Sequence, residues 1–556
     1  MIKDSSGIRK TDVINRRMFV IGAAKLIIFS GIVARLFSLQ INDNKKYLTL
    51  SDKNRIREWK LPPTRGEIVD YFGNIIAGNL KVYQLHIILE QVENFNYLLS
   101  RLKTLLELTD KKIAKILKSK NQKKPWESII VAENLSWVQF LKINNYMHDL
   151  VGVKPVMTIS RNYPFSEIYT HVLGYVSQPN ENDILENETI QERFVTGMKV
   201  GKLGLEKRLE NYLIGTNDIQ RYEVNAYGKR INQLEHQRGQ HGSKIRLTLD
   251  TEIQKLSAKL LANKAGSISV MDIYTGDVLA MYSSPSYDPN LFLFGISNDD
   301  WQLIRNNSLK PLINKTLSGL YSPGSTIKPI VALSALENKT VNESFKVRCT
   351  GKTELYGQTF HCWKEKGHGL VNLKDAMKQS CDTYFYEITR ILGVDKLKIT
   401  AEKFGLGKKV LGEYFENEKQ GLFPNTIWKK NNLGKGWVLG ETLITGIGQG
   451  YTQTTPLQLC LMTAQIANGG YKISPKIIVN NKPLNFLEAK KNMELRSSID
   501  PNLKLIKDKK NLEIVQKAMF SSTNEIRGTS YRSRIDDPKY QFAGKTGTAQ
   551  VKRISK

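Results

Sequence analysis

A long apolar run near the N-terminus is the first pattern in the chain, MFVIGAAKLIIFSGIVARLFSL at residues 18–39. About 20 such residues span the core of a bilayer as a helix. Lys25 and Arg35 interrupt the run, but both lie close enough to an end for the charge to reach the membrane surface. The sequence IVA before Arg35 is a poor signal-peptidase site. We therefore predict a retained transmembrane anchor at 18–39, preceded by a tail at 1–17.

In the next 200 residues, short segments with the apolar spacing of strands alternate with segments that have the spacing of helices. Residues 59–79 combine strand-like segments with Pro and Gly turns, and 95–145 follow the spacing of amphipathic helices. Residues 159–176 return to extended structure, and 201–231 predict a helix that stops near Gly215, followed by a strand. No catalytic cluster occurs in this region, so its predicted role is to hold and position something.

A polar, Gly-containing segment at 235–250 marks the predicted boundary between two domains, 40–240 and 241–556. A helix is predicted at 251–263. Alternating apolar residues at 266–283 then flank a Thr-Gly-Asp turn, the pattern of a β-hairpin. Many helical segments and a further strand near the end of the chain follow, which predicts an α+β domain.

The charge of the chain is high, +29 over 556 residues, while its 40% hydrophobic and 24% charged residues are ordinary for a folded protein. Attraction to nucleic acid or anionic lipid is one interpretation. No helix-turn-helix, zinc-finger or RNA-binding pattern accompanies the basic residues, so we expect a lysine-rich surface and no nucleic-acid partner. The four cysteines exclude a disulfide-built scaffold. Basic residues flank both ends of the anchor, so charge does not decide its orientation.

Three short motifs carry the candidate chemistry. In YSPGSTIKPI, a helix is predicted to start near Ser325, which places Lys328 on the same face one turn later. Ser380-Cys381-Asp382 lies between two predicted helices. FAGKTGTAQV, at 542–551, reads as a strand interrupted by glycines, where a ligand can approach the backbone closely. Each motif alone is common by chance.

In this order the three motifs, Ser-x-x-Lys, Ser-x-Asn/Asp and Lys-Thr-Gly, are the signature of penicillin-binding proteins and serine β-lactamases. With the anchor, the segment RGEIVD and the segment GKLGLEKRLENYLIGT, the chain resembles the class B penicillin-binding proteins, most closely the penicillin-binding protein 2 group, from about residue 16 onward. The resemblance implies an α/β pedestal domain and a penicillin-binding transpeptidase domain with an antiparallel sheet and helices. It also implies a cytoplasmic N-terminus, an inner-membrane anchor and a periplasmic catalytic domain.

The family chemistry can be placed on these residues. Ser325 would attack the penultimate D-Ala carbonyl of a stem pentapeptide, with Lys328 as base if burial or the cation Lys545 favours its neutral form. Ser380 would relay a proton to the leaving amine. The substrate carboxylate would bind Lys545 and Thr546. By resemblance, Gly547 belongs to the same binding segment, and the backbone N–H groups of Ser325 and Thr548 would form the oxyanion hole.

Two features depart from the wider family pattern. Asp382 replaces the commoner Asn, and a carboxylate near Lys328 would favour the charged lysine; members of the penicillin-binding protein 2 group carry Asp here. The chain also ends shortly after Gly547, where further strands and a helix follow in the family. We therefore expect a truncated transpeptidase domain in which the strand at 540–551 has an unpaired edge.

Cys349, Cys362, His368 and Cys381 form a possible Cys₃His ligand set for a structural zinc ion. A Cys349–Cys362 disulfide and three small buried side chains are the alternatives. The resemblance favours zinc, because some penicillin-binding protein 2 members carry a zinc ion beside the active site. Cys460, in an apolar run, is expected in the core.

The resemblance thus predicts a D,D-transpeptidase of cell elongation, with carboxypeptidase activity where water takes the acyl group. Stem pentapeptides, β-lactams, a SEDS-type glycosyltransferase and rod-complex proteins are the expected partners. A septal class B enzyme and a non-catalytic scaffold are the alternatives. The large pedestal argues against a β-lactamase or an antibiotic sensor.

Overall fold

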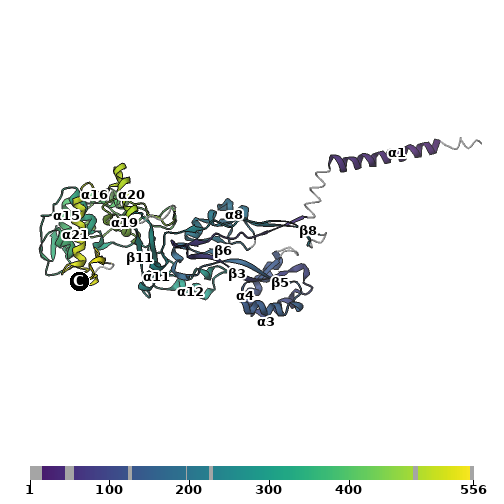
Figure 1. Cartoon of the computed structure of the whole chain (residues 1–556), viewed down its shortest axis with the longest axis horizontal. Coiled ribbons are helices and arrows are strands. Elements are labelled where there is room, and N and C mark those ends of the chain that lie inside the picture. Colours follow the sequence, from purple (N-terminus) through teal and green to yellow (C-terminus); the bar gives the residue numbers. More distant parts are fainter. Residues whose placement is uncertain are drawn as a thin grey trace, which may run out of the picture.

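The computed structural model describes residues 16–43, 56–122, 128–195, 197–224, 230–479 and 486–550. The molecule is elongated (Figure 1), with helix α1 (Arg16–Phe37) at one end and the domain that contains the C-terminus at the other. A π-helical turn, Ser38–Asn42, continues α1. The helical span Met18–Ile41 is long and apolar enough to cross a membrane, and none of its most apolar window is buried. The predicted anchor therefore forms a helix that fits a single-pass membrane span; the predicted tail lies largely outside the described residues.

The first domain is built on two sheets. An antiparallel sheet has the order β1-β8-β9, and a five-stranded sheet has the order β10-β2-β3-β4, with β5 also paired to β3. The strands are β1 (Ile56–Leu61), β2 (Ile68–Val69), β3 (Ile75–Ile88), β4 (Ser128–Leu135), β5 (Val153–Asn162), β8 (Asp218–Val224), β9 (Arg230–Gln237) and β10 (Ile245–Arg246). Helices α3 (Phe95–Leu106), α4 (Asp110–Gln122) and α5 (Trp137–Asn145) share a buried apolar core with β3, β4 and β5.

Two expectations for this domain need correction. Residues 95–145 are mostly helical, as predicted, with one strand among the helices, because SIIVAENL contains β-branched residues that pair with β3 as strand β4. Within 159–176, residues Ser166–Ile168 and Thr170–Leu173 form short helices, since their backbone groups bond locally. The polar segment 235–250 is not only a linker, because β10 pairs in parallel with β2. That pairing puts residues 245–246 into the sheet of the first domain.

The second domain contains the predicted hairpin, β11 (Gly266–Met271) paired with β12 (Val278–Ser284). Its core packs around helix α13 (Lys328–Glu337), which is buried along nearly its whole length against α15 (Asp382–Leu392) and α21 (Lys509–Asn524). The other elements are α11 (Thr251–Leu260), α12 (Asn298–Asn306), α14 (Leu373–Lys378), α16 (Val394–Lys403), α17 (Thr426–Leu433), α18 (Leu439–Gly446), α19 (Pro456–Ala467), α20 (Phe486–Ile499), β13 (Val347–Cys349), β14 (Lys352–Leu355), β15 (Gln358–His361) and β16 (Gly369–Val371). The predicted mixed α/β architecture with two domains is confirmed.

The strand predicted at 540–551 is not present among the residues the structure describes there, 540–550. Its backbone bonds elsewhere: Gly544 donates to the carbonyl of Met519, and the side chain of Asn524 donates to the carbonyl of Phe542. Because a strand needs a ladder of hydrogen bonds to a neighbour, the segment runs against α21 as an irregular chain.

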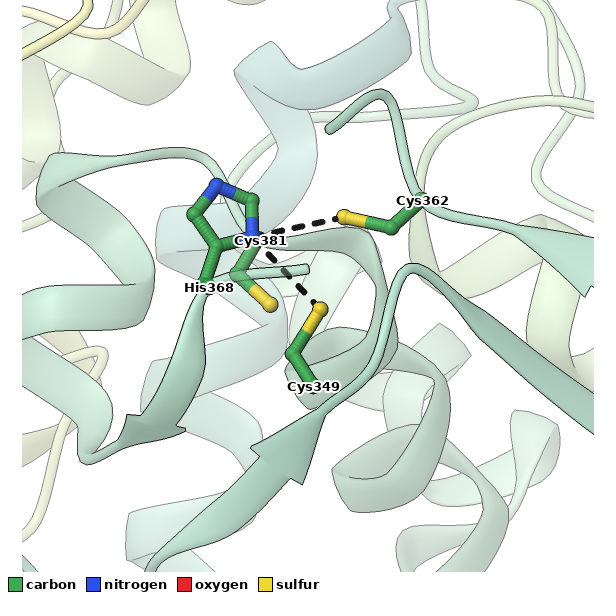
Figure 2. A group of neighbouring side chains, drawn as sticks. All are labelled: Cys349, Cys362, His368 and Cys381. Carbon is green, nitrogen blue, oxygen red and sulfur yellow. Dashed lines mark hydrogen bonds between the residues drawn. The ribbon is translucent and has the colours of Figure 1, made fainter. Parts of the chain in front are cut away.

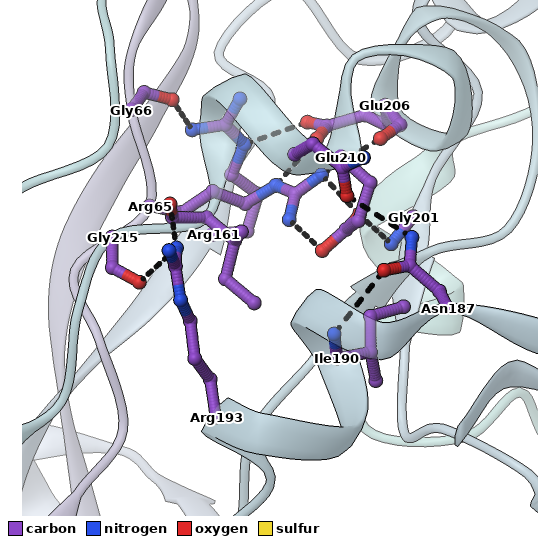
Figure 3. Close-up of polar contacts among 12 residues, drawn as sticks. Arg65, Gly66, Arg161, Asn187, Ile190, Arg193, Gly201, Glu206, Glu210 and Gly215 are labelled. Atoms are coloured by element: carbon purple, nitrogen blue, oxygen red, sulfur yellow. Dashed lines mark hydrogen bonds and ion pairs between the residues drawn. The ribbon is translucent and has the colours of Figure 1, made fainter. Parts of the chain in front are cut away.

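A buried ionic network joins the RGEIVD and GKLGLEKRLENYLIGT segments (Figure 3). The guanidinium of Arg65 contacts Glu206 at 2.6 Å and both carboxylate oxygens of Glu210 at 2.8 and 2.9 Å. Arg161, on β5, bonds Glu206 at 2.7 Å and the carbonyl of Gly66 at 2.6 Å. All four charged side chains are buried. The network therefore links the start of the domain, strand β5 and the helices α9 (Gly204–Arg208) and α10 (Glu210–Leu213).

Two guanidinium groups beside one carboxylate explain why Glu206 can be buried. Burial alone raises the pKa of Glu206, but the guanidinium groups of Arg161 and Arg65 outweigh it and hold that pKa below its usual range. The neighbouring glycine is also required, because a Cβ on Gly66 would collide with the carbonyl oxygen of Ser243. Close backbone contact thus accompanies the ion pairs.

Glu206→Gln should lower the free energy of unfolding of the first domain by about 3–5 kcal/mol, because two buried guanidinium groups lose their shared carboxylate. Urea denaturation of the full chain measures this. The matched control is Glu235→Gln, which breaks an exposed contact with Arg221 and should cost about 1 kcal/mol or less. Equal losses for the two variants would contradict the assignment.

Candidate active site

Ser325 lies in a tight turn at the start of the central helix. Residues Gly324–Ile327 form a 3₁₀ turn that leads directly into α13, so the predicted helix start is confirmed in a tighter form. Gly324 has φ of 57°, a conformation that favours glycine. A Cβ at Gly324 would meet the carbonyl oxygen of Thr548 at 2.6 Å. The first and third motifs are therefore in direct contact.

The Lys328 amine is fully buried and all its donors are used. It donates to the carbonyl of Ser380 at 2.9 Å, to the hydroxyl of Ser380 at 3.2 Å and to a carboxylate oxygen of Asp382 at 2.8 Å. An ammonium group has three donors, so this set satisfies the charged form. Asp382 lies beside Lys328 as the motif order suggested, and the two side chains form an ion pair.

The geometry of the second motif depends on one unusual backbone conformation. Ser380 has φ of 55°, the left-handed region, and joins α14 to α15 with Cys381 as the N-cap of α15. This turn directs both the carbonyl and the hydroxyl of Ser380 toward Lys328. The second carboxylate oxygen of Asp382 accepts the backbone N–H of Trp363 at 3.0 Å, so the carboxylate is held from two sides.

Lys545 completes a chain of polar contacts across the three motifs. Its amine donates to the Ser380 hydroxyl at 2.9 Å and to the Thr546 carbonyl at 2.9 Å. Burial lowers the pKa of Lys545 to about 7, and the charge of Lys328 acts in the same direction, while Asp382 opposes them. The Ser380 hydroxyl is therefore shared by two lysines, one in an ion pair with Asp382 and one whose pKa lies near neutral pH.

Ser325 itself has no side-chain hydrogen bond among the described residues, and it is partly exposed. Nucleophile–base contacts are often long in ligand-free sites and tighten with substrate. The contacts thus join two amines, a bridging hydroxyl and a carboxylate, one helical turn along the chain from Ser325. Sequence reasoning missed Trp363 and Thr529, whose hydroxyl accepts from the Thr546 hydroxyl at 2.9 Å. Adjacency to Cys362 was the available signal for Trp363; nothing in the sequence indicated Thr529.

The four predicted metal ligands gather beside this site (Figure 2). The ligand atoms of Cys349, Cys362, His368 and Cys381 all lie within 4.8 Å of one another. His368 Nδ1 is 3.5 Å from the sulfur of Cys349 and 3.5 Å from that of Cys362. A tetrahedral zinc ion with ordinary Zn–S and Zn–N distances separates its ligand atoms by about 3.5–3.8 Å. The donor set and its spacing therefore fit a closed zinc site. All four cysteines of the chain are free thiols.

The pKa shifts divide the cluster, because those of Cys349 and Cys362 are lowered while those of Cys381 and His368 are raised. A hydrogen bond from Cys381 lowers the pKa of the Cys362 thiol to about 2, and the same bond, together with burial, raises that of Cys381. Burial lowers the pKa of His368, but Cys362 and Cys349 outweigh it and raise that pKa. Metal ligation requires the thiolate. Cys460 lies apart, partly buried against the core, and its thiol faces the carbonyl of Ser269 at 3.6 Å.

Lys545 should make stability depend on pH. Its pKa is about 7 in the folded chain and about 10.4 in an unfolded one. Between these values the unfolded state holds one more proton, so this group adds stability as pH rises and removes it as pH falls toward 7. Wild type should gain about 2–3 kcal/mol over Lys545→Met between pH 6 and pH 9, as measured by urea denaturation. An unchanged difference between the two proteins would contradict the assignment.

Comparison with known proteins identifies both domains. Residues 266–556 match the penicillin-binding protein transpeptidase domain, and residues 60–247 match the penicillin-binding protein dimerisation domain. The peptidoglycan D,D-transpeptidase MrdA of Acinetobacter baumannii is 33% identical over 97% of this chain and 79% of its own length, and that of Escherichia coli K12 is 34% identical over 96% and 84%. The structure of penicillin-binding protein 2 in complex with MreC from Helicobacter pylori is similar, with a TM-score of 0.74 at 30% identity over 89% of this chain and 90% of that chain.

Proposed function

The chain belongs to the class B penicillin-binding proteins, and from this membership we propose that Ser325 is the nucleophile of its transpeptidase site. The protein is a peptidoglycan D,D-transpeptidase of the cell-elongation type. The observation that carries the site assignment is a continuous chain of contacts. Lys328, one turn along the helix from Ser325, contacts the Ser380 hydroxyl, and that hydroxyl contacts Lys545. Chance placement of the three motifs would not produce it.

In the proposed reaction, the Ser325 oxygen attacks the carbonyl of the penultimate D-Ala. The C–N bond to the terminal D-Ala breaks, and an acyl-enzyme forms. Lys328 takes the serine proton in its neutral form, after its own proton has passed through the Ser380 hydroxyl to Lys545, whose pKa of about 7 leaves that amine partly neutral. Ser380 passes a proton to the leaving amine, and its contact with both lysines supports this relay. An amino group of a second stem peptide then takes the acyl group, or water does so in a carboxypeptidase reaction.

Substrate carboxylate binding is assigned to Lys545 and Thr546, with Gly547 giving close backbone approach. The amide N–H groups of Ser325 and Thr548 are the proposed oxyanion hole. The contact between Gly324 and Thr548 supports this, because it brings the two segments together.

Acylation by a fluorescent penicillin tests the assignment. Ser325→Ala should abolish labelling of the detergent-solubilised chain, whereas Ser322→Ala, which changes a serine of the same loop, should label at a rate close to wild type. Ser380→Ala should slow labelling by about 100-fold or more, since one positioned proton-transfer group supplies about that factor. Equal labelling of wild type and Ser325→Ala would exclude the proposed nucleophile.

For the Cys₃His cluster we propose a structural zinc ion held by Cys349, Cys362, His368 and Cys381. The buried donor set and its compact spacing support zinc over a Cys349–Cys362 disulfide, since both thiols point toward His368 (Figure 2). The ion would fix the turn that carries Ser380 and Asp382. Strands β13 and β16 pair at Cys349 and Gly369, and His368 directly precedes Gly369. The pairing therefore holds two of the four ligands, Cys349 and His368, close together.

Elemental analysis of the purified chain should give about one zinc per molecule, and Cys362→Ser should lose it together with several degrees of thermal stability. The matched control is Cys460→Ser, which removes a thiol outside the cluster and should keep the metal. Absence of zinc, combined with loss of free-thiol signal from Cys349 and Cys362, would favour the disulfide.

For its surroundings we propose a cytoplasmic N-terminus, a periplasmic catalytic domain and an inner-membrane anchor. The apolar helix Met18–Ile41 supports the anchor. The Helicobacter pylori penicillin-binding protein 2 solved with MreC supports a rod-complex partner. A SEDS-type glycosyltransferase and β-lactams complete the proposed partners, by family membership.

A further inference from the structure

The first domain contains a cavity that the transpeptidase chemistry does not use. Its volume is about 590 Å³, within the usual range for small-molecule sites. One wall is a face of the β3-β4-β5 sheet that carries polar side chains: Gln84, His86, Ser128, Thr158 and Ser160. The opposite side comes from the loop before β7 (Val200–Gly201) and from apolar residues that include Phe294. A polar sheet face beside apolar side chains is suited to a ligand with both amide or hydroxyl groups and carbon surface.

Lys199 is the unusual group in this cavity. Its amine lies 3.2 Å from the Ser160 hydroxyl and 3.5 Å from the centre of the Phe294 ring. No carboxylate lies within ion-pair distance of it in the described part of the chain. Glu133 attracts the amine only from farther away. By contrast, the nearby Lys202 pairs directly with Asp183, so Lys199 is an amine that lacks its counter-ion.

A second cationic side chain of the same cavity is incompletely bonded. Arg161 is buried, and its Nη2 has no hydrogen-bond partner within the described residues. The charges of Arg161 and of Arg65, which also lines the cavity, are paired with Glu206 and Glu210. Lys60 adds a positive charge to that of Lys199, while the acidic lining residue Glu58 is already paired with Arg221. The uncompensated charge of the cavity is therefore positive, and an anionic group is the ligand that it would accept.

We infer that this cavity is a second binding site for the uncrosslinked peptidoglycan strand, with a stem-peptide carboxylate on the Lys199 amine. The inference rests on the proposed function, since that function supplies the strand as substrate. A stem peptide combines carboxylates with amide groups, and these match the amine and the polar sheet face. Binding here would hold the strand on the pedestal while a stem peptide reaches Ser325.

The protonation of Lys199 gives the site a pH dependence. Burial lowers its pKa to about 8, and Glu133 opposes this. The other charged or titratable groups of the lining are Glu58, Lys60, Arg65, His86 and Arg161. The amine is mostly charged at pH 7 and loses its charge as pH rises past about 8, so affinity for a carboxylate should fall over that interval.

The test is calorimetric titration of the detergent-solubilised full chain, acylated beforehand with penicillin, with N-acetylmuramyl pentapeptide as the probe. We expect binding that Lys199→Gln weakens at least tenfold and Lys199→Arg retains. Lys255→Gln should leave it unchanged. Lys255 is a matched control, because its amine also lies over a phenylalanine ring, Phe165, but it contacts the carboxylate of Glu252. A probe whose carboxyl groups are amidated should bind the wild-type protein only weakly. Its affinity should be close to that of the Lys199→Gln protein for the unmodified probe.

Absence of binding, or binding equally strong in wild type and Lys199→Gln, would overturn the inference. Binding unaffected by amidation of the probe would overturn it too. Penicillin labelling of Ser325 is scored separately in the same sample. Failure of labelling counts against the proposed catalytic function, whereas Lys199-independent binding counts only against the cavity.

Discussion

One buried carboxylate, that of Glu206, determines how the first domain is assembled. It lies between the guanidinium groups of Arg65 and Arg161, which come from the segment before β2 and from β5. Without it Arg161 would lose its carboxylate partner and Arg65 would keep only Glu210, and an unpaired charge in a protein interior costs several kcal/mol. The same pairs position the chain that enters from the anchor and the helices that lead to β8. The assembly of the first domain therefore depends on a small ionic centre.

The catalytic domain uses the opposite arrangement, with positive charge in excess at its centre. Lys328 and Lys545 share one hydroxyl, and a single carboxylate, Asp382, contacts Lys328. The two lysines are therefore unequal, because Lys328 forms an ion pair with Asp382 and the pKa of Lys545 falls to about 7. Such unequal neighbours allow a site to donate and accept protons at the same pH. The Cys₃His cluster adjoins this centre at two places. Cys362 precedes Trp363, whose N–H binds Asp382, and Cys381 lies between Ser380 and Asp382 in the chain.

Much of this site could be predicted from the sequence because its residues occur in short, ordered motifs. Ser325 and Lys328, one turn apart, follow from helical spacing, and the hairpin at 266–283 follows from alternation. Contacts between distant segments could not be predicted in that way. The role of the Trp363 N–H depends on tertiary packing, as does that of Thr529. The strand expected at 540–551 was wrong because apolar alternation shows which residues favour a strand, not whether a partner edge is present.

The ionic centre of the first domain also bears on how the protein folds. Arg65 and Glu206 are 141 residues apart in the chain, and β2 pairs with β10, whose residues come later still. Contacts of such high sequence separation form slowly, since a long loop must close before they contribute. The pedestal therefore cannot complete its core until the chain beyond residue 246 is available. During synthesis, its early strands have to wait in a state with unpaired edges.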